Sequence, residues 1–384
     1  MKFIVAPDKF KGSMSALEAA NIISRGIEAV WTDAEILQFP LSDGGEGLVE
    51  SLCGGTKGAI LEANVTGPLG ERLTAQWGMI KDEQTAVIEM SAASGLALVP
   101  ENKRNPLVTT TYGTGELVQE AIKYGCSKII VGIGGSATND GGAGMAQALG
   151  AKLLDQEGKD LGFGGAELTR LTAINTEKLD PRLKKIKVIV ASDVNNPLTG
   201  PQGSSQVYGP QKGASENMVE LLDEALTNYG RVIKRDLSID VDKTPGAGAA
   251  GGLGAGLIAF LNAELKSGIE MGLDALHIDK YLENCDLLIT GEGRLDAQSI
   301  HGKAPIGVAR RARCLGVPVI ALSGMIEGDP EVFHREGIEA CFAIAKGPLT
   351  LKQSIKEGPF LLENQVVELM RLVRVAIAGL SFND

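Results

Sequence analysis

The chain has 384 residues, of which 44% are hydrophobic and 22% are charged, the balance of a folded protein rather than a disordered one. Lys and Arg number 37 and Asp and Glu number 48, so the net charge is −11 at pH 7. Such a charge repels the phosphate backbone of nucleic acids and anionic membranes, so neither is an expected partner. At about 150 residues per domain, this length predicts two to three domains.

The metal-ligating and nucleophilic residue types are scattered along the chain. None of the five cysteines belongs to a CxxC pair, and none of the three histidines to an HExxH motif, so a zinc site is not expected. The first eight residues already include Pro7 and Asp8 and contain no signal-peptide core. The uncharged stretch 244–263 is mostly glycine and alanine, too weakly apolar to span a membrane. We expect a reduced, cytoplasmic protein.

The chain opens with the alternation of a strand and a helix. Residues 3–6 form an apolar run that predicts a strand, and apolar residues recur at helical spacing from residue 17 to residue 30. Ser15 and Glu18 form an S-x-x-E capping box at the start of this helix. A second apolar run, 36–41, ends in the polar, glycine-rich turn 42–47. These signals predict the beginning of a parallel α/β sheet.

The middle of the chain has a different sequence pattern. Three β-rich segments between residues 59 and 99 follow one another without helices, which indicates an antiparallel or mixed sheet. Two further strands are predicted at 128–133 and 186–191, each followed by a polar loop. Near the end, the runs 286–290, 318–322 and 340–344 are typical of buried parallel strands that alternate with helices.

Together these patterns predict an α/β protein of two domains. A Rossmann-like, doubly wound parallel sheet is expected from residues 1–58 together with 279–384. It is interrupted by a second α/β domain, residues 59–278, with a mixed sheet. Ligands of such folds bind in crevices at the carboxyl ends of the strands, and we expect the active site in the cleft between the domains.

The strongest local signal is a glycine-rich loop between the strand at 128–133 and an apolar helix. Backbone N–H groups and hydroxyls in such a loop can cradle an anion. The alternative is a well-capped turn, with Asp140 or Asn139 as the N-cap. The candidate residues are Gly134, Gly135, Ser136, Thr138, Asn139 and Asp140.

A second glycine-rich segment, 246–251, has the literal form GxGxxG. Pro245 precedes it and no clean strand comes before, so a dinucleotide fingerprint is disfavoured. Its small residues either let a helix N-terminus approach a ligand or allow close backbone packing, and Gly251 and Gly252 are candidate binding residues. A Walker-type P-loop is excluded because Lys303 is followed by Ala304.

The loop after the strand at 186–191 carries Asp193 and Asn195. A carboxylate at this position is suited to hold Mg²⁺ or to accept a proton from a hydroxyl. The alternative is an Asx-turn ahead of Pro197. Further along, Lys212 either supplies a mobile lysine or lies in an ordinary exposed loop.

Polar residues also follow three strands of the expected parallel sheet. Arg294 offers a bidentate fork for a carboxylate or phosphate. Glu292 and Asp296 could bind a metal ion or orient the side chain of Arg294. A surface salt-bridge cluster is the alternative. The full set is Gly291, Glu292, Arg294, Asp296, Gln298 and Lys303 after the third strand, Asp8, Lys9 and Lys11 after the first, and Asp43, Gly44, Gly45 and Glu46 after the second.

Six motifs, which follow one another along the chain, resemble those of the bacterial class I glycerate kinases. They are APDKFKGSMSALEAA, LSDGGEG, GIGGSATNDGG, SDVNNPLTGPQGSSQVYGPQKGA, PGAGAAGGLGAG and TGEGRLDAQSIHGK, and together they span nearly the whole chain. The resemblance implies two α/β domains, an active site between them, and ATP-dependent phosphorylation of D-glycerate with Mg²⁺, usually to 2-phosphoglycerate. Lys9 departs from the family's usual serine, and Asn195 from its frequent aspartate or threonine.

On this resemblance we predict that Asp193, Arg294 and Lys11 act in catalysis, that Asp193 and Asp296 bind the metal ion, and that the other loop residues bind substrate or nucleotide. The alternatives are a glycerate 3-kinase, a kinase of a related small hydroxy acid, an NAD(P)-dependent hydroxy-acid oxidoreductase and a non-catalytic metabolite sensor. The sequence leaves open whether the chain is a monomer or a homo-oligomer.

Overall fold

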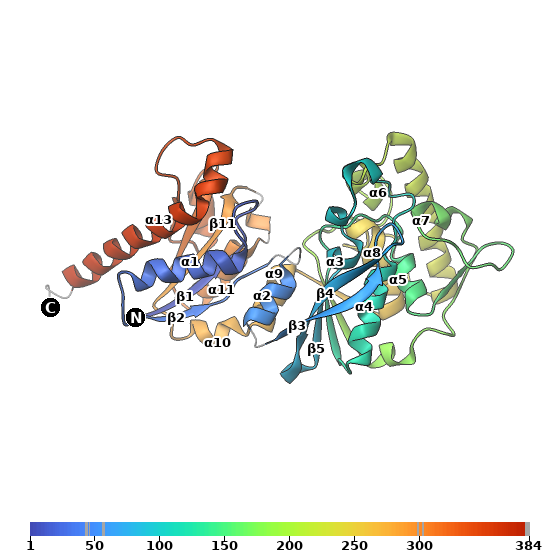
Figure 1. The fold of residues 1–384 in the computed structure, drawn as a ribbon, viewed down its shortest axis with the longest axis horizontal. Helices are drawn as coiled ribbons and strands as arrows, with labels where there is room; N and C mark the ends of the chain where they lie inside the picture. The colour runs from blue at the N-terminus through green and yellow to red at the C-terminus, as the bar shows by residue number, and fades with distance from the viewer. Residues whose placement is uncertain (43–44, 46, 56–57, 298, 302, 381–384) are drawn as a thin grey trace. The chain divides into compact units, whose positions relative to one another are not determined.

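The computed structural model describes residues 1–42, 45, 47–55, 58–297, 299–301 and 303–380. The chain forms two compact units (Figure 1). Unit 1 comprises residues 1–43, 50–56 and 269–384, and unit 2 comprises residues 44–49 and 57–268. Unit 1 is built on a parallel sheet and unit 2 on a mixed sheet, so the predicted α/β class is confirmed.

The sheet of unit 1 has five parallel strands in the order β13-β12-β11-β1-β2. Its central pair joins distant parts of the sequence, since Phe3 of β1 lies opposite Leu287 of β11. The central strands are apolar on both faces, as expected for a parallel sheet covered on both sides. The strands are β1 (Lys2–Pro7), β2 (Glu35–Gln38), β11 (Leu287–Leu295), β12 (Val319–Ile326) and β13 (Ala340–Ala343).

Helices cover this sheet according to the two-residue alternation of its side chains. Phe3, Val5 and Ile289 belong to a core that includes residues of α1 (Ala16–Glu28) and α13 (Leu351–Leu380). These two helices lie side by side (Figure 1). The fully buried Ile4 points to the opposite face, and α11 (Ala304–Cys314) packs on β1, β11 and β12. The predicted capping box of Ser15 and Glu18 is present at the start of α1.

The other helices that lie wholly or partly in unit 1 are short. They are α2 (Leu48–Gly55), α9 (Gly268–Ala275), α10 (Ile278–Leu282), α12 (Glu331–Arg335) and the single 3₁₀ turn η7 (Ser299–His301). Arg311 of α11 ties α9 and α10 to α11 through ion pairs with Glu270, Asp274 and Asp279.

The sheet of unit 2 has six strands in the order β10-β9-β6-β5-β4-β3. The β3-β4 and β4-β5 pairs are antiparallel, whereas β5-β6, β6-β9 and β9-β10 are parallel, as the sequence texture of this region indicated. The strands are β3 (Ala59–Thr66), β4 (Arg72–Ile80), β5 (Thr85–Glu89), β6 (Lys128–Gly132), β9 (Lys187–Ala191) and β10 (Glu264–Lys266), with a separate pair, β7 (Lys152–Leu154) and β8 (Ala173–Asn175).

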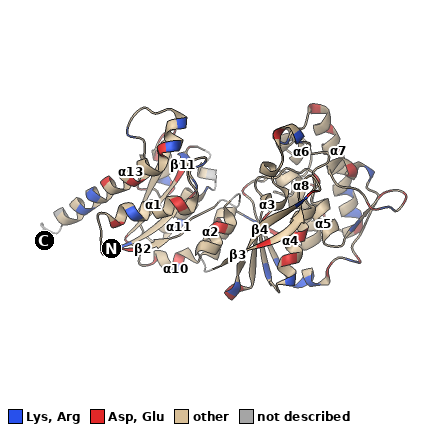
Figure 2. Cartoon of the chain, viewed as in Figure 1, with Lys and Arg blue, Asp and Glu red and all other residues tan. Residues whose placement is uncertain are grey.

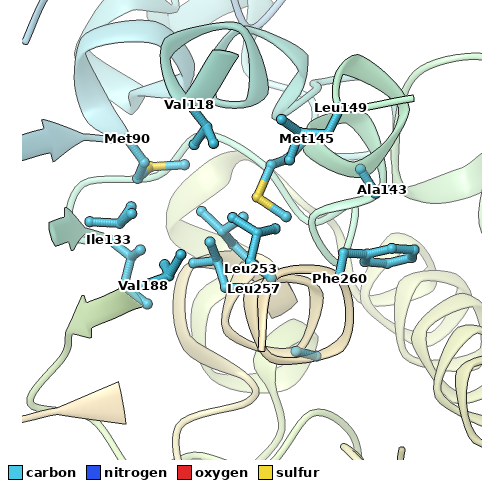
Figure 3. Close-up of a cluster of buried hydrophobic side chains, with 14 of the residues drawn as sticks. Met90, Val118, Ile133, Ala143, Met145, Leu149, Val188, Leu253, Leu257 and Phe260 are labelled. Carbon is cyan, nitrogen blue, oxygen red and sulfur yellow. The ribbon is translucent and has the colours of Figure 1, made fainter. Parts of the chain in front are cut away.

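The core of unit 2 lies between this sheet and its helices. In Figure 3, Val118 and Met145 face Leu253 and Leu257 of α8 across the buried cluster. The helices are α3 (Ser91–Ser94), α4 (Tyr112–Lys123), α5 (Ala143–Ala148), α6 (Ser204–Tyr208), α7 (Glu216–Leu237) and α8 (Ala249–Leu261). The 3₁₀ turns are η1 (Lys81–Glu83), η2 (Leu96–Leu98), η3 (Glu101–Lys103), η4 (Gly165–Arg170), η5 (Pro181–Lys185) and η6 (Pro210–Lys212).

Charges of both signs are interspersed along α13 and the outer helices (Figure 2). Within the described residues, no helix is both long enough and apolar enough to cross a membrane. Each unit contains one tryptophan, half-buried Trp31 in unit 1 and fully buried Trp77 in unit 2.

Candidate active site

In unit 2, the glycine-rich loop follows β6 and is exposed only at its beginning. Gly135 is exposed, Gly134 is half-buried, and Ser136 keeps 8% of its surface exposed. From Thr138 onward the predicted binding residues are buried, with Thr138 and Asn139 fully covered. The part of this loop that a ligand can reach directly is therefore 134–136.

The hydrogen bonds of Asp140 stabilise the fold of the loop itself. Its carboxylate accepts hydrogen bonds from the Thr111 N–H at 2.8 Å, the Thr111 hydroxyl at 2.9 Å and the Gly142 N–H at 3.1 Å. Burial raises the pKa of Asp140, and the hydrogen bonds from Thr111 and Gly142 act in the opposite direction. The N-cap of α5 is Gly142, so neither Asp140 nor Asn139 is the N-cap that the alternative interpretation expected. The Asp140 carboxylate still satisfies the backbone N–H groups of Gly142 and Gly144 at the start of α5.

Two buried polar atoms of the loop lie close to Asp140 in the sequence. The Asn139 amide donates to the Ser205 hydroxyl at 2.9 Å. The Thr138 hydroxyl and the Asn139 amide oxygen have no hydrogen-bond partner among the described residues. A buried polar atom without a partner costs about 1–3 kcal/mol, so the fold leaves hydrogen-bonding capacity in this loop.

Lys212, at the end of η6, contacts the predicted binding loop, although it is not among the predicted site residues. It is 1% exposed, and its ammonium donates to the Ser136 hydroxyl at 2.8 Å and to the Thr138 carbonyl at 2.6 Å. Burial lowers the pKa of Lys212 to about 7, and the nearby Asp140 carboxylate opposes that shift. Neither a mobile lysine nor an exposed loop describes it. Its position in the GPQKGA motif was the only signal in the sequence.

Gly251 and Gly252 lie where the buried start of α8 is kinked. Both have left-handed φ values, +74° and +84°, which L side chains rarely adopt. The Gly251 carbonyl accepts from the Gly141 N–H at 3.0 Å, and a Cβ on Gly251 would overlap the Thr138 carbonyl oxygen. The glycines thus allow close packing on the loop 138–142. The described residues include no strand directly before 246–251, so a dinucleotide fingerprint is absent here.

Asp193 is exposed just beyond the end of β9, as predicted. One of its carboxylate oxygens accepts from the Ser267 hydroxyl at 2.8 Å and from the Gly268 N–H, at the start of α9, at 3.0 Å. Asn195 is also exposed, whereas Asn196 is held by the Tyr208 hydroxyl and the Gln202 carbonyl. Asp193 is thus fixed on one side and remains open to solvent.

In unit 1, the ends of β1 and β11 bring two of the predicted loops together. The Asp8 N–H donates to the Gly291 carbonyl at 2.8 Å, so the buried Asp8 is one strand away from Glu292. Lys9 is half-buried and Lys11 is exposed. The backbone of Lys11 lies against Gly293, where a Cβ would come within 3.1 Å of the Lys11 nitrogen.

Glu292 is a buried carboxylate with a cation and a hydroxyl beside it. It accepts from the Ser299 hydroxyl at 2.8 Å and from the Lys303 ammonium at 3.3 Å. Burial raises the pKa of Glu292, while Ser299 and Lys303 lower it in part. Lys303 also lies 3.7 Å from Asp296, so two carboxylates share one lysine at the end of this sheet.

Arg294 is half-exposed and forms ion pairs with Asp296 at 3.3 Å and with Glu327, which directly follows the adjacent β12. Surface pairs of this kind contribute about 1 kcal/mol or less, so a carboxylate or phosphate could displace one at little cost. Asp43, Gly44, Glu46 and Gln298 lie outside the described residues. Gly45, which the structure describes, is half-buried.

The two predicted metal ligands, Asp193 and Asp296, differ in how well they suit a hard cation such as Mg²⁺. Among the described residues, no group of three or more His, Cys, Asp or Glu side chains is placed to hold a metal ion. Mg²⁺ in kinases is often held by one or two carboxylates together with substrate phosphates. Asp193, open to solvent, suits this role, whereas Asp296 already has two cationic side chains within 4 Å.

The model of the glycerate kinase family matches residues 3–374, almost the whole chain. The chain belongs to the glycerate kinase family. This membership makes it a kinase, and the predicted resemblance is confirmed. Similar curated proteins include the glycerate 2-kinase of Escherichia coli K12, 53% identical over 93% of both chains, and the glycerate kinase of Bacillus subtilis 168, 49% identical over 98% of both.

The fold of this family member is also found in a solved structure. A crystal structure from Salmonella typhimurium LT2 that carries the provisional name glycerate kinase 2 superposes with a TM-score of 0.90. That protein is 48% identical, and the match covers 98% of this chain and 99% of the other. The fold described above is therefore that of a solved relative.

Proposed function

We propose that this chain is an ATP-dependent glycerate kinase that works with Mg²⁺ in the cytoplasm and converts D-glycerate to 2-phosphoglycerate. The observation that carries the choice of product is the 53% identity, over 93% of both chains, with a protein named glycerate 2-kinase. The five free cysteines fit a reducing compartment.

Phosphoryl transfer requires charge neutralisation, in-line positioning and a group that orients the attacking hydroxyl. Unit 1 offers the cations Lys11, Arg294 and Lys303 at the ends of its strands. Of these, Arg294 is suited to the glycerate carboxylate or the transferred phosphoryl group, because its fork can bind two oxygens at once. Glu292 and Asp296 hold Arg294 and Lys303 in place before substrate binds.

Unit 2 offers Asp193 and the accessible part of the glycine-rich loop. The carboxylate of Asp193 would accept the proton of the attacking hydroxyl or hold the metal ion, and its contacts with Ser267 and Gly268 fix its orientation. Mg²⁺, when bound with ATP, supplies charge neutralisation at the β- and γ-phosphates.

The product is tested by incubating the purified protein with D-glycerate and MgATP and following phosphoenolpyruvate, with enolase as the only coupling enzyme. Enolase consumes 2-phosphoglycerate and not the 3-isomer, so we expect a steady signal. ADP release without phosphoenolpyruvate would identify a 3-kinase. Absence of both would mean a different acceptor or a non-catalytic protein.

The roles of Asp193 and Arg294 are tested by Asp193→Asn and Arg294→Ala. We expect each variant to lose more than about tenfold in kcat/KM, about 1.4 kcal/mol of transition-state stabilisation, because each removes a charge that acts on the reacting groups. Steady-state ADP release measures the loss. Asp160→Asn and Arg310→Ala, which remove exposed charges in ion pairs elsewhere, serve as controls. A loss below about threefold, or ~0.7 kcal/mol, in both test variants would refute the assignment.

A further inference from the structure

The amine of Lys212 lies directly behind the only part of the glycine-rich loop that reaches the surface. The ammonium donates two hydrogen bonds to that loop, one to the Ser136 hydroxyl and one to the Thr138 carbonyl. The lysine itself is 1% exposed, whereas Ser136 keeps 8% of its surface and the neighbouring Gly135 is exposed. A ligand at the surface would meet Ser136 and not Lys212.

The direction of the hydrogen bond decides what Ser136 can offer. A lysine ammonium has only donors, so the Ser136 oxygen must accept from it. The single proton of that hydroxyl is then available for a bond in another direction. An anionic oxygen is the acceptor that gains most from such a donor, because bonds to charged groups are roughly twice as strong as neutral ones.

We propose that Lys212 is a positioning residue that holds the Ser136 hydroxyl as a donor toward an anionic oxygen of a substrate. The anionic oxygen belongs to a phosphate of ATP or to the carboxylate of glycerate. This inference rests on the proposed function for the identity of those two substrates.

The charged groups around Lys212 set how this arrangement responds to pH. The Asp140 carboxylate attracts the ammonium, and Tyr229 of α7 lies close enough to Asp140 to be affected by its charge. The backbone of Arg104 packs against Gly213, next to the lysine. Burial outweighs the attraction of Asp140, so the pKa of Lys212 is about 7 in the free protein. An anion bound at Ser136 favours the charged lysine, so binding takes up a proton above pH 7.

Steady-state ADP release over pH 6–9 tests the proposal, with kcat and KM measured separately for ATP and for D-glycerate. In the wild type, we expect the KM of one substrate to rise about tenfold between pH 6 and pH 9, as Lys212 loses its proton. Ser136→Ala and Lys212→Met should have that KM raised at pH 6 and nearly constant over the range. Lys159→Met, which removes an exposed lysine, should match the wild type.

The double variant separates positioning from a merely structural role. If Lys212 acts through Ser136, the KM of Ser136→Ala/Lys212→Met stays within about twofold of the single variants, because the second change removes nothing more. A phosphate contact is identified by the effect on ATP, and a carboxylate contact by the effect on D-glycerate. The proposal is overturned if the two effects multiply, or if Ser136→Ala keeps the wild-type pH dependence. The pH dependence of Ser136→Ala tests the proposal even if Lys212→Met does not fold.

A binding measurement keeps the test independent of turnover. Calorimetric titration of ADP, and separately of D-glycerate, in two buffers of different ionisation enthalpy gives the number of protons taken up. At pH 8 we expect uptake above about half a proton for one ligand in the wild type, and none in Ser136→Ala. Equal uptake in both proteins would overturn the proposal. ADP release is the same for either phosphorylated hydroxyl, so a wrong product isomer affects only the proposed function.

Discussion

Replacement of Gly251 by alanine is expected to lower the free energy of unfolding of unit 2 by more than about 3 kcal/mol, or to prevent its folding. Gly251 has a φ of +74°, and an added Cβ would overlap the carbonyl oxygen of Thr138. Backbone cannot move aside as a flexible side chain can, so the kinked start of α8 would separate from the loop 138–142. Urea unfolding followed by Trp77 fluorescence in a Trp31→Phe background measures the loss for unit 2.

Gly200→Ala is the matched control for this substitution. Gly200 also has a left-handed φ, +86°, but a Cβ there meets no atom within 4 Å. Its loss should therefore be only the conformational cost, about 1–2 kcal/mol. Equal losses for Gly200→Ala and Gly251→Ala would mean that the close approach to Thr138 contributes nothing.

Lys212→Met is expected to change how stability depends on pH. Burial lowers the pKa of Lys212 to about 7 in the folded protein, whereas an unfolded lysine titrates near 10.4. Between these values the unfolded chain binds one more proton than the folded one, so raising the pH favours folding. This lysine therefore adds about 1.4 kcal/mol per pH unit from pH 7 to about pH 10, and below pH 7 its contribution no longer changes.

The measurement is urea unfolding of wild type and Lys212→Met at several pH values between 7 and 9.5. The difference between the two free energies of unfolding should change by about 1.4 kcal/mol per unit, whatever the constant cost of the substitution. Lys159→Met, at an exposed position, should leave the slope of the wild type unchanged. If the free energies of unfolding of wild type and Lys212→Met change in parallel with pH, the buried lysine is not desolvated, contrary to what the structure indicates.

The elements that the sequence predicted best are the buried parallel strands of unit 1. The apolar run 3–6 lies within β1 (Lys2–Pro7), and the run 286–290 overlaps the first half of β11. Such strands are covered on both faces, so their sequences are continuously apolar and easily recognised. The capping box of Ser15 and Glu18 was equally clear because both of its hydrogen bonds are local.

The candidate site was predicted less completely because burial depends on contacts between distant residues. The sequence marks Thr138, Asn139 and Asp140 as polar loop residues, but their burial results from packing by Thr111, Ser205 and the start of α8. Lys212 lies 76 residues from the Ser136 hydroxyl that it contacts. No local pattern distinguishes such a lysine from an exposed one. The catalytic and metal roles of Asp193, Arg294, Lys11 and Asp296 stay predictions.

The pairing of β1 with β11 has a consequence for the order in which the protein can form during synthesis on the ribosome. Thr290 and Ala6, which share a hydrogen bond in this sheet, are separated by 284 residues. At about 5–20 residues per second, β1 waits roughly 15–60 seconds for its partner strand. Most of unit 2 is encoded as one uninterrupted stretch within that interval and can fold first. The apolar β1 is meanwhile a segment that chaperones would be expected to bind on the nascent chain.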